Sequence, residues 1–140
     1  VQEGERITER VLPEMQQLCE ARGVRLLVAL IPTKENVFAD YLLASEDAAT
    51  RALVERLLEN ERQAKDAVCA ACAAHDIETL DLLPALREHA GMGHIYPLHR
   101  NGHPNAAGYR VIAETSAARP AQPPVPRTGS AAAGSGSGDP

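Results

Sequence analysis

The stretch that decides the fold is VRLLVALI, residues 24–31, which Pro32 closes. It is an almost continuous apolar run and lacks the polar alternation of a strand with one face in water. Continuous apolarity is typical of a strand buried on both faces, as in a parallel sheet covered by helices. We therefore expect residues 24–31 to form a central strand of a parallel sheet.

The segment before this strand has a helical pattern. Residues 3–22 carry apolar side chains at spacings of four and three: Ile7, Val11, Met15 and Leu18. Gly23 stands where the residue after a helix often adopts a left-handed conformation. Pro13 either kinks this helix or starts its second part.

The segment after the strand is expected to begin as a loop, residues 33–36, followed by VFADYLL (37–43). A helix then runs from about Ser45 to about His75, with a possible break near Asn60. Its expected buried stripe comprises Leu53, Leu57, Ala64, Val68 and Cys72.

Further elements follow in alternation. The pattern predicts a strand over residues 77–82, a short helix from Pro84 with Gly91 after its end, an extended HIYP (94–97) and a last helix over residues 104–117. The order α-β-α-β-α-(β)-α indicates an α/β fold, a three-layer sandwich with a mostly parallel sheet. Right-handed crossovers would place helices on both faces of that sheet.

Composition divides the chain into an ordered body, residues 1–118, and a Pro/Gly/Ser/Ala-rich tail, residues 119–140, which we expect to be disordered. The net charge of −5 gives no electrostatic footprint for nucleic acid. No apolar run reaches the length of a membrane span, and no signal peptide precedes the body. Because the chain begins at Val1, that absence says little about its compartment.

The cysteine pattern does not indicate a redox site. Cys69 and Cys72 form a C-x-x-C inside an alanine-rich helical stretch, whereas a thioredoxin-type motif begins a helix that follows a strand. We expect both to be plain helix residues, and we expect no disulfide framework.

The candidate chemistry lies in YPLHRNGHPNAAGYRVIAE, residues 96–114. His103 precedes the last helix, and Asn101, two residues earlier, is placed to accept the hydrogen bond that would orient its ring. Such a pair suits a general base and its orienting group. The alternative, a loop histidine that caps the helix or lies in solvent, stays open.

Two other interpretations concern Lys34 and metal binding. Lys34 follows the carboxyl end of a strand, where ligands of parallel sheets bind, and could contact substrate; the alternative is a solvated lysine. Four histidines within fifteen residues suggest a metal site: His89, His94, His99 and His103. The His99–His103 pair straddles a glycine-containing loop instead of lying on one helix face, so we expect no metal.

Three blocks of the chain resemble the SGNH (GDSL-type) hydrolases, in particular the branch related to the alginate O-acetyltransferases. They are LLVALIPTKENVFADYL (26–42), LDLLPALRE (80–88) and IYPLHRNGHPNAAGYRVIAE (95–114). The resemblance implies a flavodoxin-like sandwich that hydrolyses or transfers acyl groups, often acetyl on carbohydrate. By position, His103 matches the family's base and Asn101 its orienting acid. It further implies no cofactor and a location in the bacterial envelope or outside the cell.

Two departures from that family pattern qualify the expectation. No serine lies in a strand–turn–helix elbow, so we expect a C-terminal fragment whose nucleophile lies upstream and which is inactive alone. An amide also replaces the acid at Asn101, a change that costs about 10⁴ in turnover in a serine protease triad. The alternative is a non-catalytic SGNH-like domain that binds carbohydrate or a protein partner.

Overall fold

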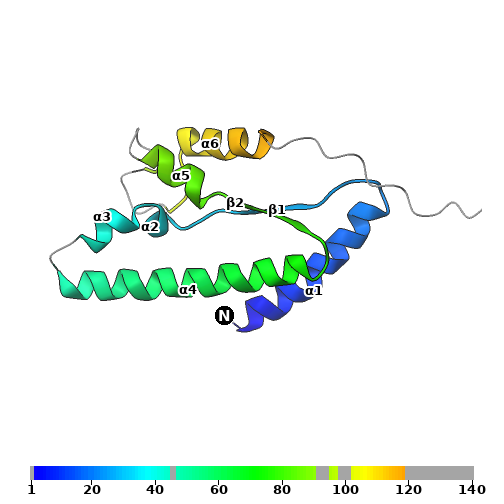
Figure 1. Ribbon diagram of the computed structural model, residues 1–140, viewed down its shortest axis with the longest axis horizontal. Coiled ribbons are helices and arrows are strands. Elements are labelled where there is room, and N and C mark those ends of the chain that lie inside the picture. The colour runs from blue at the N-terminus through cyan, green and yellow to red at the C-terminus, as the bar shows by residue number, and fades with distance from the viewer. Residues whose placement is uncertain (1, 45–46, 91–94, 98–101, 119–140) are drawn as a thin grey trace, which may run out of the picture.

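The computed structural model describes residues 2–44, 47–90, 95–97 and 102–118 (Figure 1). The elements in these ranges are α1 (Gln2–Glu20), β1 (Leu27–Leu30), α2 (Lys34–Val37), α3 (Ala39–Leu43), α4 (Ala48–Ala73), β2 (Glu78–Asp81), α5 (Leu83–Ala90) and α6 (Ala106–Ala117). The fold is thus mixed α/β. None of the helices in the described ranges combines the length and the apolarity that a membrane crossing requires.

The two strands form a parallel sheet. Leu27 pairs with Glu78 and Leu30 with Asp81, and a hydrogen bond of 3.2 Å from Leu82 N to Leu30 O extends the pairing. Figure 1 shows α4 and α1 on one side of the strands and α5 and α6 on the other. The expected α/β class and parallel pairing are confirmed at this level, with two strands in the described sheet.

Apolar side chains form two separate cores. One core joins α2, β2, α5 and α6 around Val37, Leu82, Leu86, Ile95, Tyr96 and Val111. The other joins α1, α4 and the strands around Leu12, Cys72 and Ile77, with Val28 packed against it. The two cores are built from different helices. The elements after residue 82 pack mainly in the first core.

The prediction that the first strand is buried on both faces is wrong for the described part of the chain. Residues along β1 alternate between exposed and half-buried; Leu27 is 37% exposed and Ile31, just after the strand, is 51% exposed. A strand becomes buried on both faces only when helices cover both and other strands flank it. Among the described residues, β2 alone pairs with β1.

The segment expected to be a loop after β1 is instead helical. Thr33 caps α2 by accepting a hydrogen bond of 3.2 Å from Asn36 N, and α3 follows after Phe38. A threonine in extended conformation before a helix is a common N-cap, so the signal was present in the sequence.

The long helix α4 has no break near Asn60, and Asp47 caps it by accepting from Ala49 N and Thr50 N. The expected start, Ser45, lies outside the described residues. The predicted stripe is partly wrong, because Val54 is buried while its neighbour Leu53 is 56% exposed. Cys72 is fully buried, as expected.

The third predicted strand does not form where the structure describes it: Ile95 and Tyr96 are in a bend, and His94 lies outside the described residues. The last helix begins at Ala106, two residues later than the expected start at Pro104, because Asn105 caps it. α1 runs through Pro13, and Gly23 has a positive φ of 67°, as its position after the helix predicts. The tail, residues 119–140, lies outside the described residues.

The two cores make a test of burial possible on matched leucines. Leu86→Ala removes a fully buried side chain from the first core, so we expect it to lower the free energy of unfolding by about 2–5 kcal/mol. Leu53→Ala, on the exposed side of α4, should change it by less than about 0.5 kcal/mol. Urea unfolding followed by circular dichroism measures both; equal losses would contradict the described packing.

Candidate functional site

Polar side chains meet where β1 ends. The carboxylate of Glu61, on α4, accepts hydrogen bonds from the backbone N–H of Thr33 at 3.2 Å, from the Thr33 hydroxyl and from Asn36 Nδ2 at 2.9 Å. The side chain of Thr33 meanwhile caps α2. Glu61 therefore attaches the first turn of α2 to the helix layer on one side of the sheet.

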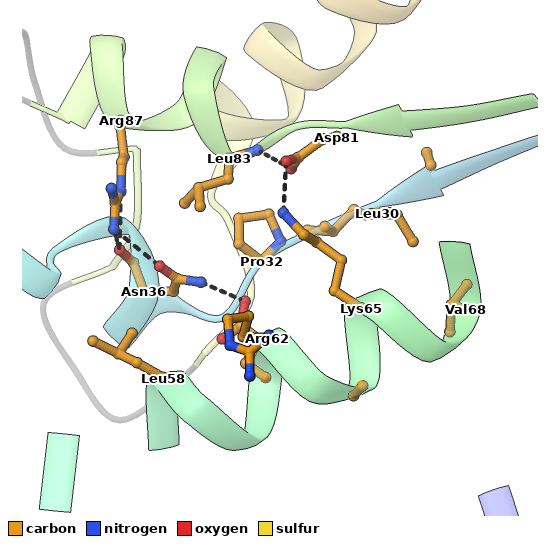
Figure 2. Close-up of a pocket in the computed structure, with 14 residues that line it drawn as sticks. Leu30, Pro32, Asn36, Leu58, Arg62, Lys65, Val68, Asp81, Leu83 and Arg87 are labelled. Atoms are coloured by element: carbon orange, nitrogen blue, oxygen red, sulfur yellow. Dashed lines mark hydrogen bonds and ion pairs between the residues drawn. The ribbon is translucent and has the colours of Figure 1, made fainter. Parts of the chain in front are cut away.

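The opposite helix layer holds the same turn. Arg87, on α5, donates from Nη2 to both the backbone oxygen and Oδ1 of Asn36, each at 3.0 Å. Asn36 thus lies between Glu61 and Arg87 and bridges α4 to α5. Figure 2 shows Asn36 beside Arg87. Hydrogen bonds to charged groups are stronger than neutral ones, so this bridge holds α2 firmly at the sheet edge.

Lys34, the first residue of α2, reaches the segment that leads to the candidate histidine. Its Nζ donates to the backbone oxygen of Pro97 at 2.6 Å, across 63 residues of sequence, in a partly buried contact. The structure therefore brings Lys34 close to residues 95–97. It does not test whether Lys34 contacts a substrate.

Residues 95–97 also pack closely on the start of α6. Asn105 N donates to Ile95 O at 3.0 Å, and Asn105 Oδ1 caps α6 by accepting from Ala107 N and Gly108 N at 2.9 and 3.1 Å. A Cβ atom on Gly108 would lie 2.4 Å from Ile95 O and 2.7 Å from Pro104 Cβ. Only glycine allows this approach of the α6 backbone to Ile95.

Tyr96 anchors this segment in the first core. The residue is 3% exposed, and its ring lies edge-on to Phe38 with centroids 6.0 Å apart. Its hydroxyl is buried without a hydrogen-bond partner among the described residues. Burial raises the pKa of Tyr96, and the charges of Glu61 and Glu35 raise it further, so the phenol stays protonated.

His103 lies at the surface, between exposed Gly102 and buried Pro104, three residues before α6 begins. The predicted place at the mouth of a helix is therefore confirmed, and the imidazole is accessible to an incoming molecule. Asn101 lies outside the described residues. Its predicted role in orienting the ring remains a prediction.

A cavity of about 520 Å³ lies beside the bridge, between α4 and the carboxyl ends of the strands, and Asn36, Glu61 and Arg87 line part of it (Figure 2). Apolar residues of β1 and α4 form much of its wall, and Lys65 contacts Asp81 at 2.9 Å beside it. Burial disfavours the charged form of Asp81, but hydrogen bonds from Leu83 N and Lys65 outweigh it and lower its pKa. His103 does not line this cavity.

The remaining sequence candidates can be placed in part. His89 Nδ1 lies 2.8 Å from Ala85 O, one turn earlier in α5, and His94 and His99 lie outside the described residues. Within the described ranges, no three metal-binding side chains cluster. Cys69 and Cys72 are plain residues of α4, as predicted, and burial raises the pKa of the Cys72 thiol, which disfavours its reactive thiolate form.

Glu61 and Arg87 are the polar residues that the sequence analysis missed. Both are charged residues of helical segments, where such side chains are usually solvated. Nothing in the sequence around them, including the block 80–88 that contains Arg87, marks either as a site residue. Their partners stand 25–51 residues away in the chain, so only the packing of α4 and α5 around α2 reveals them.

The close approach at Gly108 makes a second prediction. In Gly108→Ala the new methyl group meets the Ile95 backbone, so we expect a loss of about 1–3 kcal/mol in the free energy of unfolding. Gly4→Ala in α1, where a Cβ meets nothing within 4 Å, should instead gain up to about 1 kcal/mol from helix propensity. Thermal and urea unfolding distinguish the two; a stabilising Gly108→Ala would contradict the described contact.

Comparisons with known proteins complete the description. Neither a curated protein nor a solved structure matches this chain. A family model described as the SGNH hydrolase-like domain of the acetyltransferase AlgX matches residues 2–133. The match covers most of the chain, and it confirms the family indicated by the three sequence blocks. The chain belongs to the family of SGNH hydrolase-like domains of the acetyltransferase AlgX.

Proposed function

We propose that the protein is an ester hydrolase or O-acetyltransferase in which His103 is the general base. The observation that carries this proposal is the accessible imidazole of His103 ahead of α6, in a chain of the SGNH hydrolase-like family. In this proposal the nucleophile is a serine of the full-length polypeptide, upstream of Val1. Among the described residues Ser116 is the sole serine, and its hydroxyl donates to Ile112 O inside α6.

The proposed chemistry has two balanced halves. Serine Oγ attacks the ester carbonyl while His103 accepts its proton; the tetrahedral oxyanion collapses, and the alcohol leaves with that proton. Water or a sugar hydroxyl then attacks the acyl-serine, giving its proton to His103, and the serine is regenerated when His103 returns the proton. Backbone or amide N–H groups would stabilise each oxyanion.

In this proposal Asn101 accepts a hydrogen bond from the imidazole and fixes which ring nitrogen faces the serine. An amide orients the ring but does not stabilise the imidazolium by charge, as a carboxylate does. The presence of an amide at Asn101, where the family has an acid, favours one alternative: a non-catalytic SGNH-like domain that binds carbohydrate or a protein partner.

The described sheet has two strands, fewer than a sandwich of this family is expected to have. We propose that residues 1–118 are the C-terminal part of a three-layer sandwich, whose further strands pair along β1. Exposed apolar side chains lie along α1, on β1 and just after it: Ile7, Met15, Leu18, Leu27 and Ile31. Exposed apolar surface next to an unpaired strand edge is a liability that natural sheets cover. The tail, residues 119–140, is proposed to be disordered, although the family match extends to residue 133.

The proposed substrates are acyl esters, most simply acetyl esters of carbohydrate, and the proposed setting is the bacterial envelope or the exterior. Catalysis by a serine, a histidine and an oxyanion hole needs no cofactor or metal. The acidic net charge of −5 disfavours nucleic acid as a partner.

The base assignment is tested on the full-length polypeptide with an activated acetyl ester such as p-nitrophenyl acetate. We expect His103→Ala to lower turnover by at least about 10²-fold, because proton transfer by the base is lost. His75→Ala, at the exposed end of α4, is the matched control and should keep wild-type turnover. Equal rates in wild type and His103→Ala would instead favour the binding domain.

The role of Asn101 is tested in the same assay. We expect Asn101→Asp to raise turnover by about tenfold or more, because a carboxylate stabilises the imidazolium, and Asn101→Ala to lower it. Mass spectrometry after treatment with a serine-directed phosphonate would locate the nucleophile. If neither variant changes the rate, Asn101 has no part in the reaction.

A further inference from the structure

We propose that Lys34 is a positioning residue for His103, because it binds the backbone of Pro97 ahead of the histidine. The proposal rests on the proposed function, since it assigns a role within the same site. Its basis is the hydrogen bond of 2.6 Å from Lys34 Nζ to Pro97 O. The chain passes Pro97 six residues before it reaches His103.

Lys34 lies on a helix that contacts two neighbouring helices. It begins α2, and the first turn of α2 is tied to α4 through Glu61 and to α5 through Arg87, both of which bind Asn36. Val37 at the end of the helix is buried in the first core. Through these contacts, the positions of α4 and α5 determine where Lys34 binds Pro97.

Asn105, two residues after His103, is held by a second contact that does not involve Lys34. Asn105 N donates to Ile95 O, and Gly108 lets the backbone of α6 approach Ile95. Pro97, six residues before His103, is therefore bound by Lys34, and Asn105, two residues after it, is bound to Ile95. His103 itself is exposed, and these two anchors lie on either side of it in the chain.

The contact has the strength that a positioning role requires. An ammonium–carbonyl hydrogen bond is charge-assisted, and this one is partly buried, where water competes less. A displacement of about 1 Å in a catalytic group can cost about 10²-fold in rate. Loss of the Lys34 anchor should therefore slow the chemical step while substrate binding stays nearly intact.

Steady-state kinetics on the full-length polypeptide separate positioning from substrate contact. We expect Lys34→Met, which keeps the length of the side chain, to lower kcat by about tenfold or more while KM changes by less than about twofold. Lys34→Arg keeps a cationic donor and should recover part of kcat. Lys65→Met is the matched control, because Lys65 is also half-buried and bonded, to Asp81 on β2; it should keep the wild-type kcat.

A second readout does not depend on activity. The readout is the NMR signal of the His103 ring in protein labelled isotopically at histidine, and its loss in His103→Gln identifies it. We expect this signal to shift or broaden in Lys34→Met and to stay unchanged in Lys65→Met. A thermal melt of each variant checks that the fold persists.

Each outcome decides between distinct alternatives. A raised KM with unchanged kcat in Lys34→Met would overturn positioning and assign Lys34 to substrate binding. An unchanged His103 signal together with unchanged kinetics would also overturn it. If wild type and His103→Ala are equally inactive, the proposed function fails, while the ring signal still reports whether Lys34 positions His103.

Discussion

The parallel pairing of β1 with β2 is the constraint on which the rest of the structure depends. Because both strands point the same way, residues that follow them emerge at one edge, and the hydrogen bond from Leu82 N to Leu30 O continues the pairing to that edge. The chain then turns directly into α2 after one strand and α5 after the other. This is why Asn36 and Arg87, 51 residues apart, come within hydrogen-bonding distance.

The polar bridge at that edge solves a local problem of packing. Short helices such as α2 gain little from their own backbone hydrogen bonds, so contacts with neighbouring elements must hold them. Glu61 and Arg87 supply charged partners from opposite layers, while Val37 supplies apolar burial. Lys34 then extends the same scaffold to Pro97, and the backbone contact at Gly108 joins α6 to it. Residues 95–97 and the start of α6 are thereby connected, through α2, to both α4 and α5.

The two sides of the described sheet differ in how their side chains are packed. β1 presents apolar side chains to solvent, and the cavity beside it is bounded by α4 and the strand ends. The first core, with Leu82 and Leu86 fully buried, holds Ile95 and Tyr96, which precede His103 in the chain. The candidate base thus follows a well-packed segment in the chain. Three residues of the polar bridge, Asn36, Glu61 and Arg87, line the cavity.

The sequence by itself determined the family, the alternation of helices and strands, and the place of His103 ahead of the last helix, because apolar periodicity, Pro and Gly are local signals. It misjudged the burial of Leu27, Ile31 and Leu53, since burial depends on which elements cover a residue, and it passed over the cap at Thr33. Only the tertiary structure decided that Lys34 binds Pro97 and that Glu61 and Arg87 share Asn36. These contacts join residues 25–63 positions apart, and their charged side chains look like any solvated ones until the helices pack.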